Sequence, residues 1–193
     1  MKSVLLVFTL ISWTLIPSWG WCSSDLEGQW VQPCEKGLER TQHFKASHSH
    51  LLESFYLDHQ CTKPFMQLRT TGQFSTQGAH IDFIFTRVSV RLLDAAQVLK
   101  FNTRAVCGFT KWEINKFYDV SGRICDLLLL GHAFEVPPPG EKRFGIFRIQ
   151  ESDLHHSRLL FFGQGNAKLN STTPEKRPQT YQSQPFFFQN SSE

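Results

Sequence analysis

Alternation of apolar and polar residues with a period of two is the feature that most restricts the fold of this chain. In HIDFIFTRVSV the apolar residues Ile81, Phe83 and Phe85 share one face. From Val88 onward the apolar residues follow the opposite phase. Side chains of a β-strand alternate between the faces of a sheet, so the pattern predicts a strand. The change of phase predicts a β-bulge near Thr86.

Seven further segments have the composition of short strands. Turn formers such as Ser121-Gly122 and the PPPG run at 137–140 separate them. One segment, LLDAAQVLKFN, predicts a short amphipathic helix with Asp94 as its N-cap. Many short strands with a single helix predict an antiparallel barrel or sandwich. The predicted strands span residues 30–32, 51–57, 65–70, 111–118, 124–130, 144–149 and 158–162.

Residues 1–22 have the layout of a cleaved secretory signal peptide. Lys2 precedes the apolar run VLLVFTLISWTLI, and small residues follow it. The run is shorter than the about 20 apolar residues that cross a bilayer. We expect cleavage before Ser23, or alternatively after Gly20. We also expect a secreted, extracellular protein with no transmembrane or lipid anchor.

Five cysteines, at positions 22, 34, 61, 107 and 125, are an odd number for a secreted chain. Cleavage before Ser23 would remove the first of them and leave an even number. Three pairings of the other four are possible. We expect Cys34 to pair with Cys61, and Cys107 with Cys125, because each bridge would then join neighbouring strands. A zinc site is the alternative, but the chain has no Cys-x-x-Cys spacing and the compartment is oxidising.

The composition excludes some partners and leaves two kinds of interior open. The formal net charge of +3 falls to +2 without Lys2, which argues against nucleic acid as the partner. The 18 Phe and 5 Trp residues, against 2 Met, favour rigid apolar walls. Such walls occur in a packed core and around a ligand cavity. The length predicts one domain, residues 23–166, and the polar composition of 167–193 predicts a flexible tail.

A Gly-x-Trp pair, Gly28 and Trp30, opens the first predicted strand, and such a pair closes one end of lipocalin-type barrels. The surrounding LEGQWVQPCE is followed in order by CTKPF, GAHIDFIFTRVSV, LLDAAQV, CGFTKWEINKFYDV and RLLFFGQG. In this order and spacing, the segments resemble one repeat of the adenomatosis polyposis coli down-regulated family of extracellular Wnt inhibitors. The closing PEKRPQTYQ is similar to the second repeat of that family rather than the first.

The resemblance implies an all-β fold, an open lipocalin-like antiparallel β-barrel with one short helix. It places Trp30 at the base of the barrel, with Arg158 stacked on its ring. It also implies a lipid in the barrel and binding to Wnt through its acyl chain. The family's first repeat and membrane anchor have no counterpart in this sequence, so an apolar mouth would need a cover. We expect a second copy, in a homodimer, to cover it, and the alternative is the segment PFFFQ at 185–189.

We therefore expect a non-catalytic secreted domain that shelters a lipid or acyl chain and inhibits Wnt signalling, without a cofactor. Residues at alternating strand positions would line the pocket. The alternatives are a structural or adhesion module with a filled barrel, and a secreted metal hydrolase. The expected pocket residues are Phe55, Leu57, Leu68, Phe83, Phe85, Trp112, Ile114, Leu128 and Phe147.

Histidines and sequons complete the candidate sites. His48 and His50 share a strand face, and the pair His155-His156 lies near Asp153. A zinc site needs three or four converging ligands, so we expect no metal here. The sequons predict N-glycosylation; they begin at Asn170 and Asn190.

Overall fold

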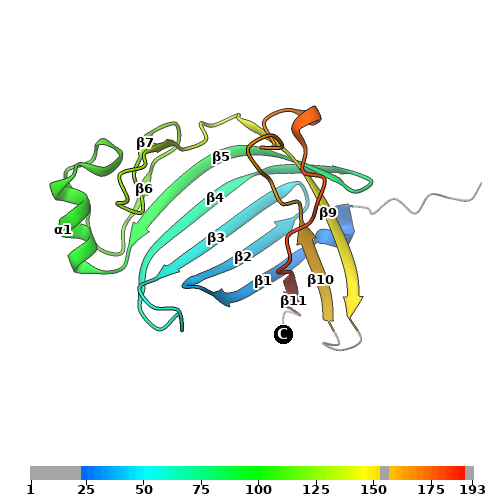
Figure 1. Ribbon diagram of the computed structural model, residues 1–193, viewed down its shortest axis with the longest axis horizontal. Helices are drawn as coiled ribbons and strands as arrows, with labels where there is room; N and C mark the ends of the chain where they lie inside the picture. The colour runs from blue at the N-terminus through cyan, green and yellow to red at the C-terminus, as the bar shows by residue number, and fades with distance from the viewer. Residues whose placement is uncertain (1–22, 153–156, 190–193) are drawn as a thin grey trace, which may run out of the picture.

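The computed structural model describes residues 23–152 and 157–189, and antiparallel β-strands dominate it (Figure 1). The predicted signal peptide, Asp153, His155, His156 and Asn190 lie outside these residues. The helices are η1 (Ser23–Leu26), α1 (Ala95–Thr103), η2 (Val106–Gly108) and η3 (Pro174–Lys176). The strands are β1 (Gly28–Glu35), β2 (Leu38–Lys45), β3 (His48–Tyr56), β4 (Pro64–Gln77), β5 (His80–Leu92), β6 (Phe117–Asp119), β7 (Ile124–Cys125), β8 (Phe134–Glu135), β9 (Lys142–Ser152), β10 (Ser157–Phe162) and β11 (Phe186–Gln189).

Hydrogen bonds join eight of these strands in a ring. The order around the ring is β5, β4, β3, β2, β1, β11, β10 and β9, and β9 pairs with β5 to complete it. All of these pairings are antiparallel. The predicted all-β class, an antiparallel barrel with one short α-helix, is therefore confirmed.

The predicted β-bulge is confirmed, and it lies where β5 changes neighbours. Phe85 of β5 is opposite Gly72 of β4. Arg87 is opposite Thr71, so Thr86 has no opposite residue. A Cβ at Gly72 would lie 2.3 Å from a β5 carbonyl oxygen, so only glycine fits there. Before the bulge β5 pairs with β9, and after it with β6, so the ring is closed along half of β5 and open beyond.

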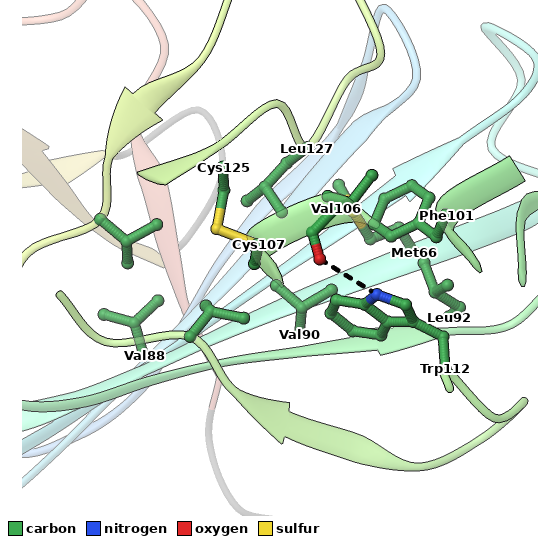
Figure 2. Packing of buried hydrophobic residues seen from close by; sticks show 12 residues of the cluster. Met66, Val88, Val90, Leu92, Phe101, Val106, Cys107, Trp112, Cys125 and Leu127 are labelled. Atoms are coloured by element: carbon green, nitrogen blue, oxygen red, sulfur yellow. Dashed lines mark hydrogen bonds between the residues drawn. A yellow bond between two sulfur atoms is a disulfide. The ribbon is translucent and has the colours of Figure 1, made fainter. Parts of the chain in front are cut away.

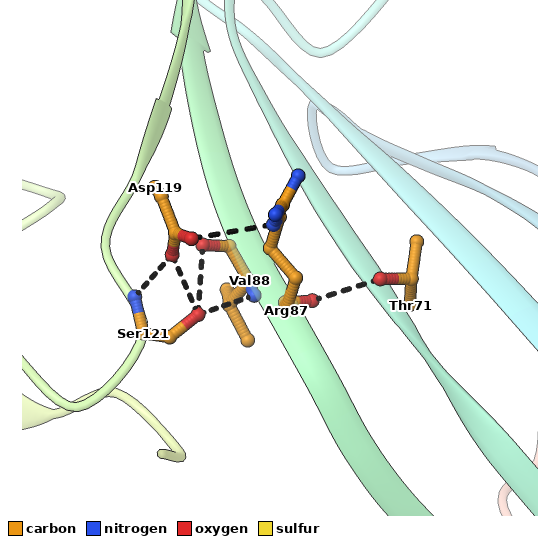
Figure 3. Close-up of polar contacts among 5 residues, drawn as sticks. All are labelled: Thr71, Arg87, Val88, Asp119 and Ser121. Carbon is orange, nitrogen blue, oxygen red and sulfur yellow. Dashed lines mark hydrogen bonds and ion pairs between the residues drawn. The ribbon is translucent and has the colours of Figure 1, made fainter. Parts of the chain in front are cut away.

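A polar network supports β5 just after the bulge, where β9 no longer pairs with it (Figure 3). Val88 N donates to Ser121 Oγ at 2.8 Å, and this hydroxyl donates to Asp119 Oδ1 at 2.7 Å. Arg87 Nε lies 3.2 Å from the other Asp119 oxygen. A backbone N–H shielded from water needs an acceptor, and Ser121 provides one for Val88.

The bulge keeps the apolar residues of both halves of β5 on the concave face of the barrel. Phe83 is opposite Phe74, and Val90 is opposite Leu68. The positions of Phe74 and Leu68 in β4 differ by an even number, and side chains alternate along a strand, so the two share a face. Without the extra residue, Val90 would point out of the barrel.

Two apolar clusters occupy the two ends of this concave face. The first, the base cluster, lies inside the ring and consists of Leu26, Trp30, Phe44, Phe74, Ile81, Phe147, Ile149, Leu160 and Phe186. The second, the cap cluster, forms where residues 95–136 fold over the open end (Figures 1 and 2). It consists of Met66, Val88, Val90, Leu92, Phe101, Val106, Cys107, Trp112, Val120, Cys125, Leu127 and Val136.

Trp112 is a buried anchor of the cap cluster. Its side chain is 2% exposed and packs on Phe101, with ring centroids 5.3 Å apart. Its Nε1 donates to the Val106 carbonyl at 3.2 Å (Figure 2). The side-chain amide of Asn102 makes two hydrogen bonds to the Trp112 backbone. The Trp112 N–H donates to Asn102 Oδ1 at 2.6 Å, and Asn102 Nδ2 donates to the Trp112 carbonyl at 3.1 Å. The cap is thus fixed by polar contacts as well as by burial.

Both predicted disulfide pairings are confirmed. Cys107–Cys125 joins η2 to β7 inside the cap cluster (Figure 2), and Cys34–Cys61 joins the end of β1 to the segment between β3 and β4. In the chain-entropy model, loops of such length contribute about 3 kcal/mol each.

The predicted strands 111–118 and 124–130 are wrong over most of their length. Only Phe117–Asp119 and Ile124–Cys125 are strands there. Asn115 and Leu129 have positive φ angles, 62° and 56°, which interrupt an extended strand. These segments form turns of the cap instead.

Strand β2 was not predicted. Its inward positions include Arg40 and Gln42, which are opposite Glu53 and Leu51 of β3. Polar residues at inward positions remove the alternation on which strand prediction depends.

The predicted flexible tail, 167–193, is wrong for its last described part. Residues Phe186–Gln189 form β11 between β1 and β10, and the Phe186 side chain is 3% exposed. The segment PFFFQ is therefore neither a tail nor a cover over the mouth, because it supplies a strand of the barrel wall. The burial of an aromatic side chain in the base cluster offsets the cost of ordering it.

Removing the Phe186 side chain is predicted to destabilise the barrel. Truncation of a buried Phe to Ala costs about 3–5 kcal/mol in free energy of unfolding. Phe187→Ala is the matched control, because the ring of Phe187 is next to Phe186 on β11 and is partly exposed. This control should lower the free energy of unfolding much less. Urea unfolding followed by tryptophan fluorescence checks this. Equal effects of the two substitutions would contradict the placement of Phe186 in the core.

Candidate binding cavity

The base of the barrel is closed by the residues that the sequence predicted. The Trp30 side chain is fully buried, and its Nε1 donates to the Leu26 carbonyl at 2.7 Å. The Arg158 guanidinium lies 5.3 Å from the Trp30 ring centroid, within cation–π range, and donates to the Asp25 carbonyl at 2.5 Å. Gly28 has a φ of 119°, and a Cβ there would lie 2.6 Å from the Phe188 ring. These contacts hold η1 across the base.

A cavity of about 320 Å³ lies on the concave face above the base cluster. Its volume is at the lower end of the range of small-molecule sites, about 300–1,000 Å³. One part of its wall is apolar and comes from β3, β5, β9, β10 and β11. The apolar wall contains Leu51, Ile81, Phe83, Ile146, Phe162 and Phe186.

The opposite part of the cavity wall is polar. Arg40 Nε donates to Glu53 Oε1 at 2.8 Å, and Arg40 Nη1 donates to Gln32 Oε1 at 2.8 Å. The Arg40 and Glu53 side chains are 31% and 17% exposed. Gln42, 4% exposed, lies between this ion pair and the base cluster along β2. The cavity therefore has an apolar side and a side with hydrogen-bonding groups.

A strap, residues 164–185, covers the cavity on the side of β9 and β10 (the orange-to-red segment in Figure 1). Ser171, Pro178 and Gln182 of the strap contribute to the lining. Its ends are held by backbone hydrogen bonds, from Gln164 N to Thr180 O at 2.7 Å and from Gln182 N to Phe162 O at 2.9 Å. The strap is thus part of the folded barrel and narrows the way into the cavity.

Arg177 attaches the middle of the strap to the barrel wall. Its Nη1 donates to the Gly145 carbonyl at 2.7 Å, and its Nη2 lies 2.5 Å from Asp82 Oδ1. Its guanidinium also lies 5.3 Å from the Phe144 ring centroid. The Arg177 side chain is 15% exposed, so water screens these contacts less than those of a surface pair.

The predicted pocket residues separate into three groups. Phe83 lines the cavity, and Phe85 shares its face through the pairing with Gly72. Phe147 is buried in the base cluster, Trp112 is in the cap cluster, and Phe55 and Leu68 pack against the cap cluster. The prediction is wrong for the last group, Leu57, Ile114 and Leu128, which are 55%, 48% and 50% exposed. All three were assigned to the pocket by strand alternation, but none of them lies in a strand.

The polar wall and the strap were not predicted from the sequence. Arg40 and Glu53 belong to strands whose inward residues are partly polar, and all of the strap after residue 166 lies within the predicted tail. The spacing of residues along β2 could have indicated the polar wall, because Arg40, Gln42 and Phe44 occupy alternate positions. Buried Phe44 marks the inward face of β2 and assigns Arg40 to it.

The predicted histidine pair lies on the outer face of the barrel, away from the cavity. His50 is opposite His43 of β2, and His48 is opposite Lys45. Burial, followed by the charges of Arg69 and His43, lowers the pKa of His50 below its ordinary value. Within residues 23–152 and 157–189, no group of three or more His, Cys, Asp or Glu side chains could hold a metal ion.

Asn170 is exposed on the strap, where a glycan would meet no packed side chain. Its Oδ1 accepts a hydrogen bond from Thr172 Oγ1, the hydroxyl of the same sequon, at 2.7 Å. Among the described residues no helix is long and apolar enough to cross a membrane.

Comparison with models of known protein families and with curated proteins finds no match for this chain. The cavity and its walls are therefore the features that indicate a function.

Removing the Arg177 guanidinium is predicted to loosen the strap. Hydrogen bonds to a charged group contribute about 1.5–3 kcal/mol each, so Arg177→Gln should raise amide exchange in the strap by roughly thirty-fold. Hydrogen exchange followed by mass spectrometry measures this. Lys176→Gln, at the exposed neighbouring position, is the control and should leave exchange unchanged. Equal exchange in both variants would mean that Arg177 does not hold the strap.

Proposed function

We propose that this protein is a secreted, non-catalytic binding domain that shelters an apolar chain, such as a fatty acyl group, in the barrel cavity. The observation that supports this most is the cavity of about 320 Å³ between the apolar wall, the strap and the closed base. An apolar wall facing a few polar groups is the usual composition of a ligand site. The two disulfides fit an oxidising compartment, which supports secretion.

The apolar wall suits a chain better than a flat, polar ligand. Burial of one methylene contributes about 0.8 kcal/mol, so eight methylenes contribute about 6 kcal/mol before the costs of association are subtracted. A single chain of this length is a better fit to the cavity than a lipid with two long chains, given a volume at the lower end of the usual range.

The resemblance to the adenomatosis polyposis coli down-regulated family extends this proposal to an acyl chain attached to a protein. Under this extension the ligand is an acylated protein such as Wnt, and binding of its acyl chain inhibits signalling. A homodimer also stays a prediction, and light scattering of the purified protein would check it.

A structural module with a filled barrel is the second candidate function. The base cluster favours it, because the aromatic rings of Trp30, Phe44 and Phe147 fill one end of the barrel without any ligand. Native mass spectrometry of the purified protein separates the two candidates. The binding proposal predicts a co-purifying lipid of mass consistent with one acyl chain, and the filled barrel predicts none.

Filling the cavity is predicted to weaken lipid binding strongly without unfolding the protein. Leu51 lines the cavity, so Leu51→Trp should reduce binding of a fluorescent single-chain lipid by about tenfold or more, since the new ring occupies the space of the chain. Leu52→Trp adds the same ring on the outer face, because neighbouring residues of a strand point to opposite faces, and it should bind like the unmodified protein. Fluorescence titration measures both. If neither the unmodified protein nor Leu52→Trp takes up lipid, the filled-barrel function replaces this proposal.

A further inference from the structure

Two cations line the cavity within the described residues, and each is paired with a carboxylate. Arg40 Nε is 2.8 Å from Glu53 Oε1, and Arg143 Nη2 is 2.5 Å from Glu141 Oε1. The four side chains are between 17% and 31% exposed. The positive charges that could hold an anionic group are therefore already neutralised inside the protein.

Two uncharged amides, Gln32 and Gln42, lie beside the Arg40–Glu53 pair on β1 and β2. Gln32 accepts from Arg40 and donates to the Gln184 carbonyl at 3.1 Å, so its amide is engaged on both sides. Gln42, 4% exposed, makes a single side-chain hydrogen bond among the described residues, a long one of 3.4 Å to the carbonyl of its neighbour His43. Gln42 thus keeps hydrogen-bonding capacity next to the cavity.

A carboxylate and an uncharged polar group would meet this wall differently. A carboxylate beside Arg40 would have to displace Glu53 or lie next to it, and like charges in a partly buried site repel. Displacing Glu53 would leave it buried without its partner, which is costly. A hydroxyl, ester or amide carries no net charge and can exchange hydrogen bonds with Gln42 without disturbing the ion pair.

We propose that the cavity selects lipids whose polar end is uncharged, an ester, an amide or an alcohol, and discriminates against free fatty acid anions. The Arg40–Glu53 pair is the specificity determinant: Glu53 occupies the place that a ligand carboxylate would take on Arg40. This inference rests on the proposed function, because it names the class of lipid that the same cavity accepts.

The test compares three ligands with the same chain: dodecanoate, methyl dodecanoate and dodecanol. Each displaces the neutral dye N-phenylnaphthylamine from the full protein at about pH 8, where the acid is ionised, and below its micelle concentration. The unmodified protein should bind the ester and the alcohol about tenfold more tightly than dodecanoate. Equal or tighter binding of dodecanoate overturns the inference and leaves the proposed function standing.

Substitution of Glu53 makes the test specific to the ion pair. Glu53→Gln releases Arg40, so it should tighten dodecanoate binding by about tenfold and change methyl dodecanoate binding by less than about twofold. Glu39→Gln is the matched control: Glu39 precedes Arg40 on β2, faces outward and accepts a hydrogen bond from Tyr56 at 2.8 Å. It removes the same charge, so an equal gain in both variants would reveal a long-range effect and overturn the inference.

A second variant covers the case in which Glu53→Gln does not fold. Glu141→Gln releases Arg143, the other lining cation, and should also tighten dodecanoate binding relative to methyl dodecanoate. If it leaves the ratio unchanged, the inference is overturned. If none of the three ligands displaces the dye from the unmodified protein, the proposed function itself fails, and the inference falls with it.

Discussion

The single extra residue in β5 is the constraint on which the rest of the structure depends. With Thr86 left unopposed, Phe83 and Val90 face the same side of the sheet. The base cluster and the cap cluster can therefore form on one continuous concave face, with the cavity on that face above the base cluster. At the same position β5 stops pairing with β9 and begins to pair with β6. The bulge therefore marks the point where the closed part of the ring ends and its open end begins.

Sequence patterns predicted those parts of the fold that depend on apolar side chains facing one way. The alternation in β5, the Asp94 cap of α1 and the Trp30 closure were readable because each obeys a local rule. The cap was not readable, because the segments around Trp112 have no apolar period and positive φ angles at Asn115 and Leu129 interrupt them. Strand β11 was hidden because a short aromatic triplet within a polar stretch becomes a strand only when β1 and β10 are already beside it.

The candidate site was less predictable than the fold for a related reason. An apolar residue in a strand can be assigned to the inner face from the sequence alone. An arginine that faces inward looks like a surface residue in the sequence until its ion-pair partner is known. Arg40 and Glu53 are opposite each other only through the register of β2 and β3, which the hairpin between them sets. Knowledge of that register, with Phe44 as the inward marker, would have assigned both to the cavity.

The position of β11 in the ring has a consequence for the way in which the chain reaches its native state. Gln29 and Gln189, whose side chains bond at 3.1 Å, are 160 residues apart in the sequence. The meander from β1 to β5 can assemble early from neighbouring hairpins, yet one edge of β1 stays without its neighbour until nearly the whole chain has been synthesised. Such non-local closure is slow, and an unpaired strand edge promotes association with other chains. Ring closure is therefore the step at which a chaperone would act most effectively on this barrel.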